Sequence, residues 1–303
     1  MADAVAWLFP GQGSQAVGMG KQLAARHPVA AEVYKIADET LGIPVSTLCW
    51  EGPAEDLTRT ANQQPALLAT SIAMQRVLAE QGQIDRPAFI AGHSLGEYSA
   101  LVAGGALDLA DALRLVRRRG ELMEQYGLGG MIALIGMDDE AAQVLANETG
   151  TEVANYNSPG QVTLSGTDEA LAVAEMAAPE RGARRVVRLP VNGAFHSSLM
   201  EPVAAELARD IEQVAMREPI APLVTNVDAT PISHPDDLRR ELVEQISRSV
   251  QWVRVVERLV AEGVTAAVEI GPGNVLAGLA RRIDRSLAVK TADQLLAEDG
   301  ESA

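Results

Sequence analysis

The sequence predicts an α/β fold in which a large domain with a mostly parallel sheet is interrupted by a small inserted domain. Short apolar strands alternate with longer helical stretches, turn residues follow the strands, and the alternation changes its order between about residues 129 and 196. The chain has 303 residues, of which 47% are hydrophobic, so it can bury a sizeable core.

Four apolar runs are the expected strands of the large domain. They cover residues 5–9, 88–92, 221–227 and 265–270. Each is followed by Gly, Pro, Asp or Asn, which favour turns. Their alternation with helical stretches predicts a largely parallel sheet that is covered by helices on both faces.

Two helices of the large domain are predicted from apolar periodicity. The first begins at Pro65, because proline is favoured in the first helical turn, and runs to about residue 82. The second begins with Asp108 at the N-cap and runs to about residue 127.

A different order of elements marks the inserted domain. Residues 129–196 are predicted to form strand, helix, strand, strand, helix and strand, the order of a ferredoxin-like module. Further helical and strand patterns follow this segment. We therefore expect a discontinuous large domain, residues 1–128 and 197–303, with residues 129–196 inserted into it.

The segment GHSLG, residues 92–96, has the G-x-S-x-G pattern of a nucleophile elbow, with a buried strand before it and a helix after it. In such a turn the Ser94 hydroxyl stands above the sheet, and glycines let neighbouring backbone pass closely. This pattern indicates a hydrolase-like large domain with Ser94 as its nucleophile. The alternative interpretation is a tight turn with a capping serine.

A serine nucleophile needs a base, and the chain has four histidines. His27 and His234 lie in polar or turn-rich stretches, and the side chain of His93 is expected to point away from Ser94. His196 follows the last strand of the inserted domain, where a side chain can face the cleft between domains. We therefore expect His196 to be the base, with a core or capping histidine as the alternative.

The group that orients this histidine is not evident from the residues. A hydrolase with an elbow places Asp or Glu between serine and histidine in the chain. No carboxylate between residues 95 and 195 stands out at a strand end. This favours an orienting group other than a carboxylate and weakens the interpretation as an ordinary esterase.

Charge and composition exclude several classes of partner. A formal net charge of −16 argues against nucleic acid or an anionic membrane as the main partner. No stretch approaches the roughly 20 apolar residues of a membrane span. Cys49, the lone cysteine, fits a reducing compartment, so we expect a cytoplasmic protein.

Eight segments in order resemble the malonyl-CoA:acyl carrier protein transacylases, a bacterial fatty-acid-synthesis family related to polyketide acyltransferase domains. The segments are LFPGQGSQ, QQPALL, GHSLGEYSAL, RRRG, NSPGQV, GAFHS, VQW and EIGPGNVL. The resemblance covers nearly the whole chain. It implies that Ser94 is acylated, that His196 is its base and that Gln251 of VQW is the partner of that histidine. It also implies an oxyanion hole formed by the backbone N–H groups of Leu95 and Gln12.

The resemblance further implies that Arg119 holds the free carboxylate of the malonyl group. Helical periodicity places Arg118 opposite the apolar stripe and leaves both Arg117 and Arg119 on its flanks, so only the resemblance selects between these two. A guanidinium suits this role because it binds a carboxylate with two hydrogen bonds.

Three more residues are candidates for contact with the substrate. Gln64 is a polar contact or, equally, a helix cap, and Asn157 matches the family but also suits a turn. Phe195 resembles the AFH pattern of malonyl-selective members, in which a ring would occupy the space of a methyl branch.

The expected partners are malonyl-CoA and acyl carrier protein, without metal or redox cofactor, nucleic acid or membrane. We expect a monomer. The basic segment around Arg184 and Arg185 is expected to help dock the carrier protein. A hydrolase, a non-catalytic docking module and a transacylase that loads malonate decarboxylase remain alternatives.

Overall fold

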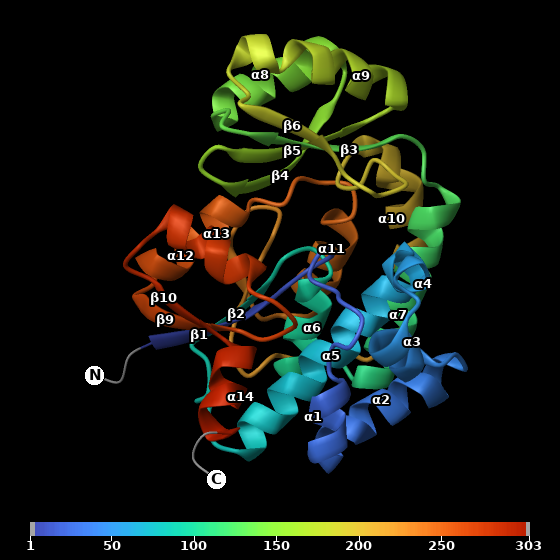
Figure 1. Cartoon of the computed structure of the whole chain (residues 1–303), viewed down its shortest axis with the longest axis vertical. Coiled ribbons are helices and arrows are strands. Elements are labelled where there is room, and N and C mark those ends of the chain that lie inside the picture. The colour runs from blue at the N-terminus through green and yellow to red at the C-terminus, as the bar shows by residue number, and fades with distance from the viewer. Residues whose placement is uncertain (1–3, 301–303) are drawn as a thin grey trace.

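A computed structural model describes the backbone of residues 4–300 and the side chains of residues 4–297. It contains one six-stranded and one four-stranded sheet. Figure 1 shows the four-stranded sheet with its two helices at the top of the view, above a larger body that surrounds the six-stranded sheet.

The six-stranded sheet has the order β10-β9-β1-β2-β7-β8. All its neighbours pair in parallel except β7 and β8. Its strands are β1 (Ala4–Phe9), β2 (Phe89–Gly92), β7 (Leu223–Val224), β8 (Pro231–Ile232), β9 (Val264–Glu269) and β10 (Ala288–Thr291). The largely parallel sheet is thus confirmed.

Differences from the predicted strands lie at the edges of this sheet. The run 221–227 forms a strand at only two residues, because Thr225 and Asn226 turn away into hydrogen bonds with side chains. The edge strands β8 and β10 were not predicted, since they are short and, unlike β1 and β9, carry no apolar run.

The centre of the sheet positions the loops that matter for function. Phe9, the last residue of β1, pairs with Gly92, the last residue of β2. Because parallel strands end at the same edge, the segments that follow them leave the sheet side by side. One carries Gln12 and the other carries Ser94.

Helices surround the six-stranded sheet (Figure 1). They are α1 (Lys21–Arg26), α2 (Pro28–Leu41), α3 (Val45–Glu51), α4 (Ala54–Thr58), α5 (Thr60–Glu80), α6 (Gly96–Ala103), α7 (Leu109–Gln125), α10 (Glu201–Gln213), α11 (Pro235–Glu244), α12 (Trp252–Ala261), α13 (Val275–Ile283) and α14 (Ala292–Gly300), with a 3₁₀ turn at Ser198–Met200. The predicted helix after Asp108 is confirmed as α7.

The start of α5 was predicted wrongly. The helix begins at Thr60, so Pro65 lies inside it. A proline inside a helix leaves the carbonyl four residues earlier without its N–H donor. Here that carbonyl, Ala61 O, accepts a hydrogen bond of 3.2 Å from Arg117 Nη1, which compensates for the missing donor.

The four-stranded sheet has the predicted ferredoxin-like order of elements. They are β3 (Gly130–Ile135), α8 (Asp139–Thr149), β4 (Glu152–Ser158), β5 (Gln161–Gly166), α9 (Asp168–Ala177) and β6 (Arg185–Arg188). The strands pair only antiparallel, in the order β4-β5-β3-β6, and enclose an apolar cluster of their own with α8 and α9. Division of the chain at residues 128/129 and 196/197 stays a prediction.

Backbone hydrogen bonds hold the four-stranded sheet against a segment of the larger body. Tyr156 N–H on β4 donates to Val250 O, and Val250 N–H donates to Ala154 O, at 2.9 and 2.8 Å. This contact holds the edge of the small sheet against the segment that leads into α12. Within residues 4–300, no helix is long and apolar enough to cross a membrane.

Candidate active site

Ser94 lies in a sharp turn between β2 and α6, as the elbow pattern predicts. Its φ of 52° is left-handed, which for a residue other than glycine costs on the order of 1–3 kcal/mol. The flanking glycines are sterically required. A Cβ at Gly92 would lie 1.9 Å from the carbonyl carbon of Gly96, and one at Gly96 would lie 2.1 Å from Phe9 O.

His196 contacts this serine directly. Its Nε2 lies 2.8 Å from Ser94 Oγ, and both side chains are buried. Like Ser94, His196 has a left-handed backbone, with a φ of 58°. The only other non-glycine residue of positive φ in the described backbone is Ala229. Backbone strain is thus concentrated at the two residues whose side chains meet.

The orienting group of His196 is a pair of backbone carbonyls. His196 Nδ1 lies 2.7 Å from Gln245 O and 3.2 Å from Arg248 O. Because a carbonyl only accepts hydrogen bonds, Nδ1 carries the proton. Nε2 therefore has its lone pair free to accept the proton of Ser94 Oγ.

The prediction that Gln251 is the partner of His196 is wrong. Gln251 precedes the first residue of α12, its N–H donates to Asn226 O, and it lines a separate surface hollow beside Tyr156 and Glu257. By residue 251 the chain has already turned away from the histidine. The expectation of a neutral orienting group holds, but the atoms are carbonyl oxygens, which no residue type in the sequence identifies.

The surroundings keep His196 neutral. Burial, with the positive charge of Arg119 as the next cause, lowers the pKa of His196 to about 3. An imidazole with this pKa is unprotonated throughout the neutral pH range. It is available as a base without first losing a proton to solvent.

Arg119 is fully buried on the other side of the serine. Its Nη2 donates to Ser94 Oγ at 3.0 Å and to Gln245 Oε1 at 3.2 Å, and its Nη1 donates to Gln64 Oε1 at 2.9 Å. Its Nε has no partner within the described part of the chain, and no carboxylate there forms an ion pair with it. The guanidinium is therefore a buried cation without a counterion, and binding of an anion beside it would be favourable.

Neighbouring arginines of the same helix differ in this respect. Arg117 pairs with Glu121 at 2.6 Å, and Arg118 pairs with Glu206 at 3.0 Å. Only Arg119 of the three reaches Ser94. Of the two arginines that helical periodicity left open, Arg119 is thus the one beside Ser94.

Gln64 supports this arginine and is not a helix cap. It lies inside α5, is fully buried, accepts from Arg119 and donates to Met123 Sδ. Its neighbour Gln63, which the sequence did not single out, lines the cavity over Ser94 and accepts from Gln12 Nε2 at 2.7 Å. Gln64 thus lies behind the guanidinium, and Gln63 faces the cavity.

The cavity over Ser94 has a volume of about 290 Å³. Phe195 lines it, together with Met131 of β3 and Leu189, which follows β6. Most of its accessible surface is apolar, so the polar atoms of Ser94 and His196 stand at the end of a largely apolar space.

Polar residues from two strands meet beside Ser94. His93 lines the cavity, with its Nε2 2.9 Å from Asn157 Oδ1 and its ring packed on Trp252. The expectation that its side chain points away from Ser94 stays a prediction. Asn157 therefore contacts His93, and Asn155, two residues earlier on β4, faces the cavity. Contact of Asn157 with the substrate stays a prediction, and Asn155 is a further candidate that the sequence did not single out.

The two N–H groups expected to form an oxyanion hole belong to neighbouring segments. Gln12 lines the cavity, and Leu95 directly follows Ser94. Within residues 4–300 neither backbone N–H donates to a protein acceptor. The loop after β1 packs tightly on the elbow, since a Cβ at Gly11 would lie 2.5 Å from His93 O.

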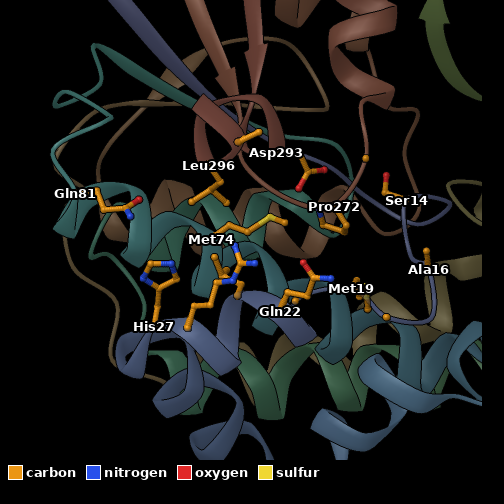
Figure 2. Close-up of a pocket in the computed structure, with 16 residues that line it drawn as sticks. Ser14, Ala16, Met19, Gln22, His27, Met74, Gln81, Pro272, Asp293 and Leu296 are labelled. Atoms are coloured by element: carbon orange, nitrogen blue, oxygen red, sulfur yellow. The ribbon is translucent and has the colours of Figure 1, made fainter. Parts of the chain in front are cut away.

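A larger hollow of about 770 Å³ lies on the other face of the loop that carries Gln12. Figure 2 shows it between Ser14 and Met19 of this loop, Met74 of α5, and Asp293 of α14. None of its lining residues is Ser94, His196 or Arg119. Its size therefore does not make it the candidate site, which lies in the smaller cavity.

The chain is similar to proteins of known activity over nearly its whole length. The model of the acyl transferase domain family matches residues 6–297. Proteins named malonyl CoA-acyl carrier protein transacylase are 43% identical in Bacillus subtilis, over 99% of both chains, and 43% identical in Escherichia coli, over 95% of this chain and 96% of that one.

Solved structures agree with these relatives. An acyl carrier protein S-malonyltransferase from Vibrio cholerae superimposes with a TM-score of 0.91 at 41% identity, covering 95% of this chain and 96% of that one. A malonyl-CoA:acyl carrier protein transacylase from Xanthomonas oryzae gives 0.94 at 40% identity, over 99% of both. A malonyl-transacylase solved in complex with its type II PKS acyl-carrier protein gives 0.92 at 40%, over 95% of both.

Proposed function

The chain belongs to the acyl transferase family, and we propose that it moves a malonyl group from malonyl-CoA to the phosphopantetheine thiol of an acyl carrier protein, for fatty acid or polyketide synthesis. The observation that favours malonyl is the position of Arg119. This buried cation lies at hydrogen-bond distance from Ser94 Oγ and has no anionic partner among the described residues. Acetyl groups have no charge to offer it, whereas malonyl groups have a carboxylate.

The first half of the reaction loads the serine. His196 Nε2 accepts the proton of Ser94 Oγ, and the oxygen attacks the thioester carbonyl carbon. The N–H groups of Leu95 and Gln12 hold the oxyanion of the tetrahedral intermediate. The carbon–sulfur bond then breaks, and the CoA thiolate takes the proton from His196.

The second half reverses these steps with another thiol. The phosphopantetheine thiol gives its proton to His196 and attacks the malonyl-serine ester. The ester bond breaks, and Ser94 Oγ recovers the proton from the imidazolium. Carbonyl oxygens of Gln245 and Arg248 keep the ring in one orientation through both halves, although they stabilise the imidazolium less than a carboxylate does.

Distance supports Arg119 as the selector. The malonyl carboxylate carbon is two bonds beyond the ester carbonyl carbon, so a guanidinium 3.0 Å from Ser94 Oγ is within reach of it. Two unit charges about 4 Å apart at an effective dielectric near 20 attract by roughly 4 kcal/mol before desolvation. Half of this energy gives more than about tenfold discrimination against acetyl.

Two further points concern metal ions and the cellular location of the protein. No step needs a metal, and the described residues contain no group of three His, Cys, Asp or Glu that could hold one. We further propose a cytoplasmic location, supported by the buried free thiol of Cys49.

Transfer to a thiol is separated from hydrolysis by following both products. The protein is mixed with malonyl-CoA and phosphopantetheinylated acyl carrier protein, and malonyl-carrier protein and free malonate are measured over the same interval. The proposal predicts that malonyl-carrier protein is the main product. Free malonate as the main product would instead identify a thioesterase, and carrier protein binding without either product would identify a docking module.

A further inference from the structure

Asn226 fastens the turn that carries Ser94. Its Oδ1 accepts the N–H of Ser94 at 2.7 Å, and its Nδ2 donates to Gly92 O at 2.6 Å. Because an N–H only donates and a carbonyl only accepts, the orientation of this amide is fixed by its partners. One fully buried side chain thus bridges the end of β2 at Gly92 and the strained residue Ser94.

These hydrogen bonds stabilise a turn that is otherwise unfavourable, because Ser94 has left-handed backbone angles, which residues with a side chain rarely adopt. Its carbonyl oxygen is also held, by Gln245 Nε2 at 3.2 Å. Both peptide groups of Ser94 are therefore hydrogen-bonded to amide side chains. These contacts determine where Oγ stands relative to His196 Nε2.

Two carboxyl groups in turn hold Asn226. Its backbone N–H lies 2.8 Å from Glu97 Oε1 and 2.9 Å from Glu241 Oε1. Glu241 Oε1 also accepts from Val227 N–H at 3.1 Å. Glu97 belongs to the first turn of α6 and Glu241 to α11, so the pair connects the nucleophile helix to the segment after β7.

These two acids form a buried carboxyl pair. Both are buried and hydrogen-bonded to each other, and Glu97 Oε2 has no further partner within the described residues. Burial, together with the neighbouring carboxyl group, raises the pKa of Glu97 well above its usual range. Burial raises the pKa of Glu241 to about 7. The charged groups that face the pair are Arg119 from α7 and Asp228 from the turn after β7.

We propose that Asn226 is the positioning residue of the Ser94 nucleophile and that the buried acid pair Glu97–Glu241 is its anchor. The inference rests on the proposed function only in that Ser94 is the nucleophile. It concerns how the turn is held, and neither Asn226 nor the acids line the cavity over Ser94.

The test uses a probe that needs neither malonyl groups nor carrier protein. The rate at which phenylmethylsulfonyl fluoride modifies Ser94 is measured between about pH 6 and about pH 9 and divided by the wild-type rate at each pH. Variants are Asn226→Asp and Asn226→Ala, with Asn147→Asp on the exposed face of α8 as the matched control.

Asn226→Asp is expected to show a pH-dependent rescue. An ionised carboxylate cannot donate to Gly92 O, so at about pH 9 we expect the relative rate to fall at least tenfold. When protonated, the introduced carboxyl donates to Gly92 O and accepts from Ser94 N–H, so the relative rate rises as pH falls. Asn226→Ala stays slow at every pH, and Asn147→Asp stays at the wild-type rate.

The anchor is tested by a conservative and a disruptive change of Glu97. Glu97→Gln keeps an oxygen for Asn226 N–H and an N–H for Glu241, so we expect a rate within about threefold of the wild type. Glu97→Leu keeps neither, and we expect at least a tenfold loss. With malonyl-CoA, the disruptive variants should lower kcat while KM changes by less than about twofold, since no substrate contact is lost.

Two results would overturn the proposal. One is an Asn226→Asp rate within about twofold of the wild type at every pH, and the other is a loss that does not vary with pH. If Asn226→Ala does not fold, the pH dependence of Asn226→Asp still decides. A different result is that the variants react with the probe as expected while the wild type forms no malonyl ester from malonyl-CoA. That result would refute the proposed function and leave the positioning role of Asn226 standing.

Discussion

Two buried sites of opposite charge adjoin the Ser94 turn. The cation side is Arg119, whose hydrogen-bond partners are all neutral. The acid side is Glu97 and Glu241, which have no cation in hydrogen-bond contact. Burying an unpaired charge is unfavourable in both cases. The acids reduce their charge by keeping a proton, whereas a guanidinium cannot lose one at neutral pH.

This difference distinguishes a binding site from a structural one. The carboxyl pair has its partners within the protein, because each acid has the other and the N–H of Asn226, and among the described residues only Glu97 Oε2 of the pair is left buried without one. Arg119 has no anionic partner among the described residues. This difference supports the two proposals, that the cation side binds the substrate carboxylate and that the acid side holds the turn in place.

The largest effect is expected from removing the base on the cation side. His196→Ala leaves Ser94 Oγ without a proton acceptor, and we expect the rate of malonyl-serine formation to fall by about 10³-fold or more. Rapid-quench measurement of the acyl-enzyme checks this. A variant that retains about a tenth of the wild-type rate would assign the base elsewhere.

Arg119→Gln is expected to have the next largest effect and bears directly on the comparison. Loss of the buried cation should lower the kcat/KM for malonyl-CoA by about 10²-fold while that for acetyl-CoA falls far less. Arg117→Gln, on the same helix but paired with Glu121, is the matched control. Equal losses for both substrates would mean that Arg119 does not read the carboxylate.

Phe195→Ala should enlarge the cavity beside Ser94. A single methyl branch is worth about 1–3 kcal/mol, so we expect the ratio of methylmalonyl to malonyl transfer to rise about tenfold. Competition between the two CoA esters measures this ratio. An unchanged ratio would show that the ring does not limit branching.

The acid side predicts a dependence of stability on pH. Because folding raises the pKa values of Glu97 and Glu241 above those of the unfolded chain, their contribution is fully present at acid pH and is lost as pH rises through the folded values. Between about pH 5 and about pH 8, we expect the free energy of unfolding of the wild type to fall by about 1–3 kcal/mol more than that of Glu97→Gln. Denaturant unfolding at both pH values measures this difference, and parallel pH profiles would contradict it.

Exposed cations provide the smallest expected effect. Arg184 and Arg185 are exposed and have no ion pair within the described residues, whereas Arg188 on the same strand pairs with Asp168 and Glu175. Reversing both charges to Glu should lower the kcat/KM for acidic carrier protein severalfold, roughly 3- to 10-fold, at low salt and leave loading by malonyl-CoA unchanged. Reversal of Arg281 and Arg282 on α13 is the control. Unchanged transfer would place docking on another surface.

The sequence predicted those parts of the molecule that depend on local pattern. The parallel sheet, the ferredoxin-like module and the elbow at Ser94 follow from apolar periodicity and glycine positions, and they are present. Contact between His196 and Ser94 was also predicted. Such features can be derived because each residue type is required by the geometry it adopts.

Features that depend on backbone atoms or on distant segments were missed. The acceptors of His196 are carbonyls, which every residue has, so Gln251 was chosen where Gln245 and Arg248 contribute. Asn226 follows β7 and reaches the elbow across 132 residues of sequence. Only tertiary packing brings such partners together.

The central claim, that the buried cation beside Ser94 selects the acyl group, is tested most directly by intact mass spectrometry. The wild type, Ser94→Ala and Arg119→Gln are mixed briefly with equal amounts of malonyl-CoA and acetyl-CoA. The account predicts a malonyl adduct on the wild type, no adduct on Ser94→Ala and a shift toward acetyl on Arg119→Gln. A malonyl adduct that persists without Ser94, or an Arg119→Gln protein that still prefers malonyl, would contradict it.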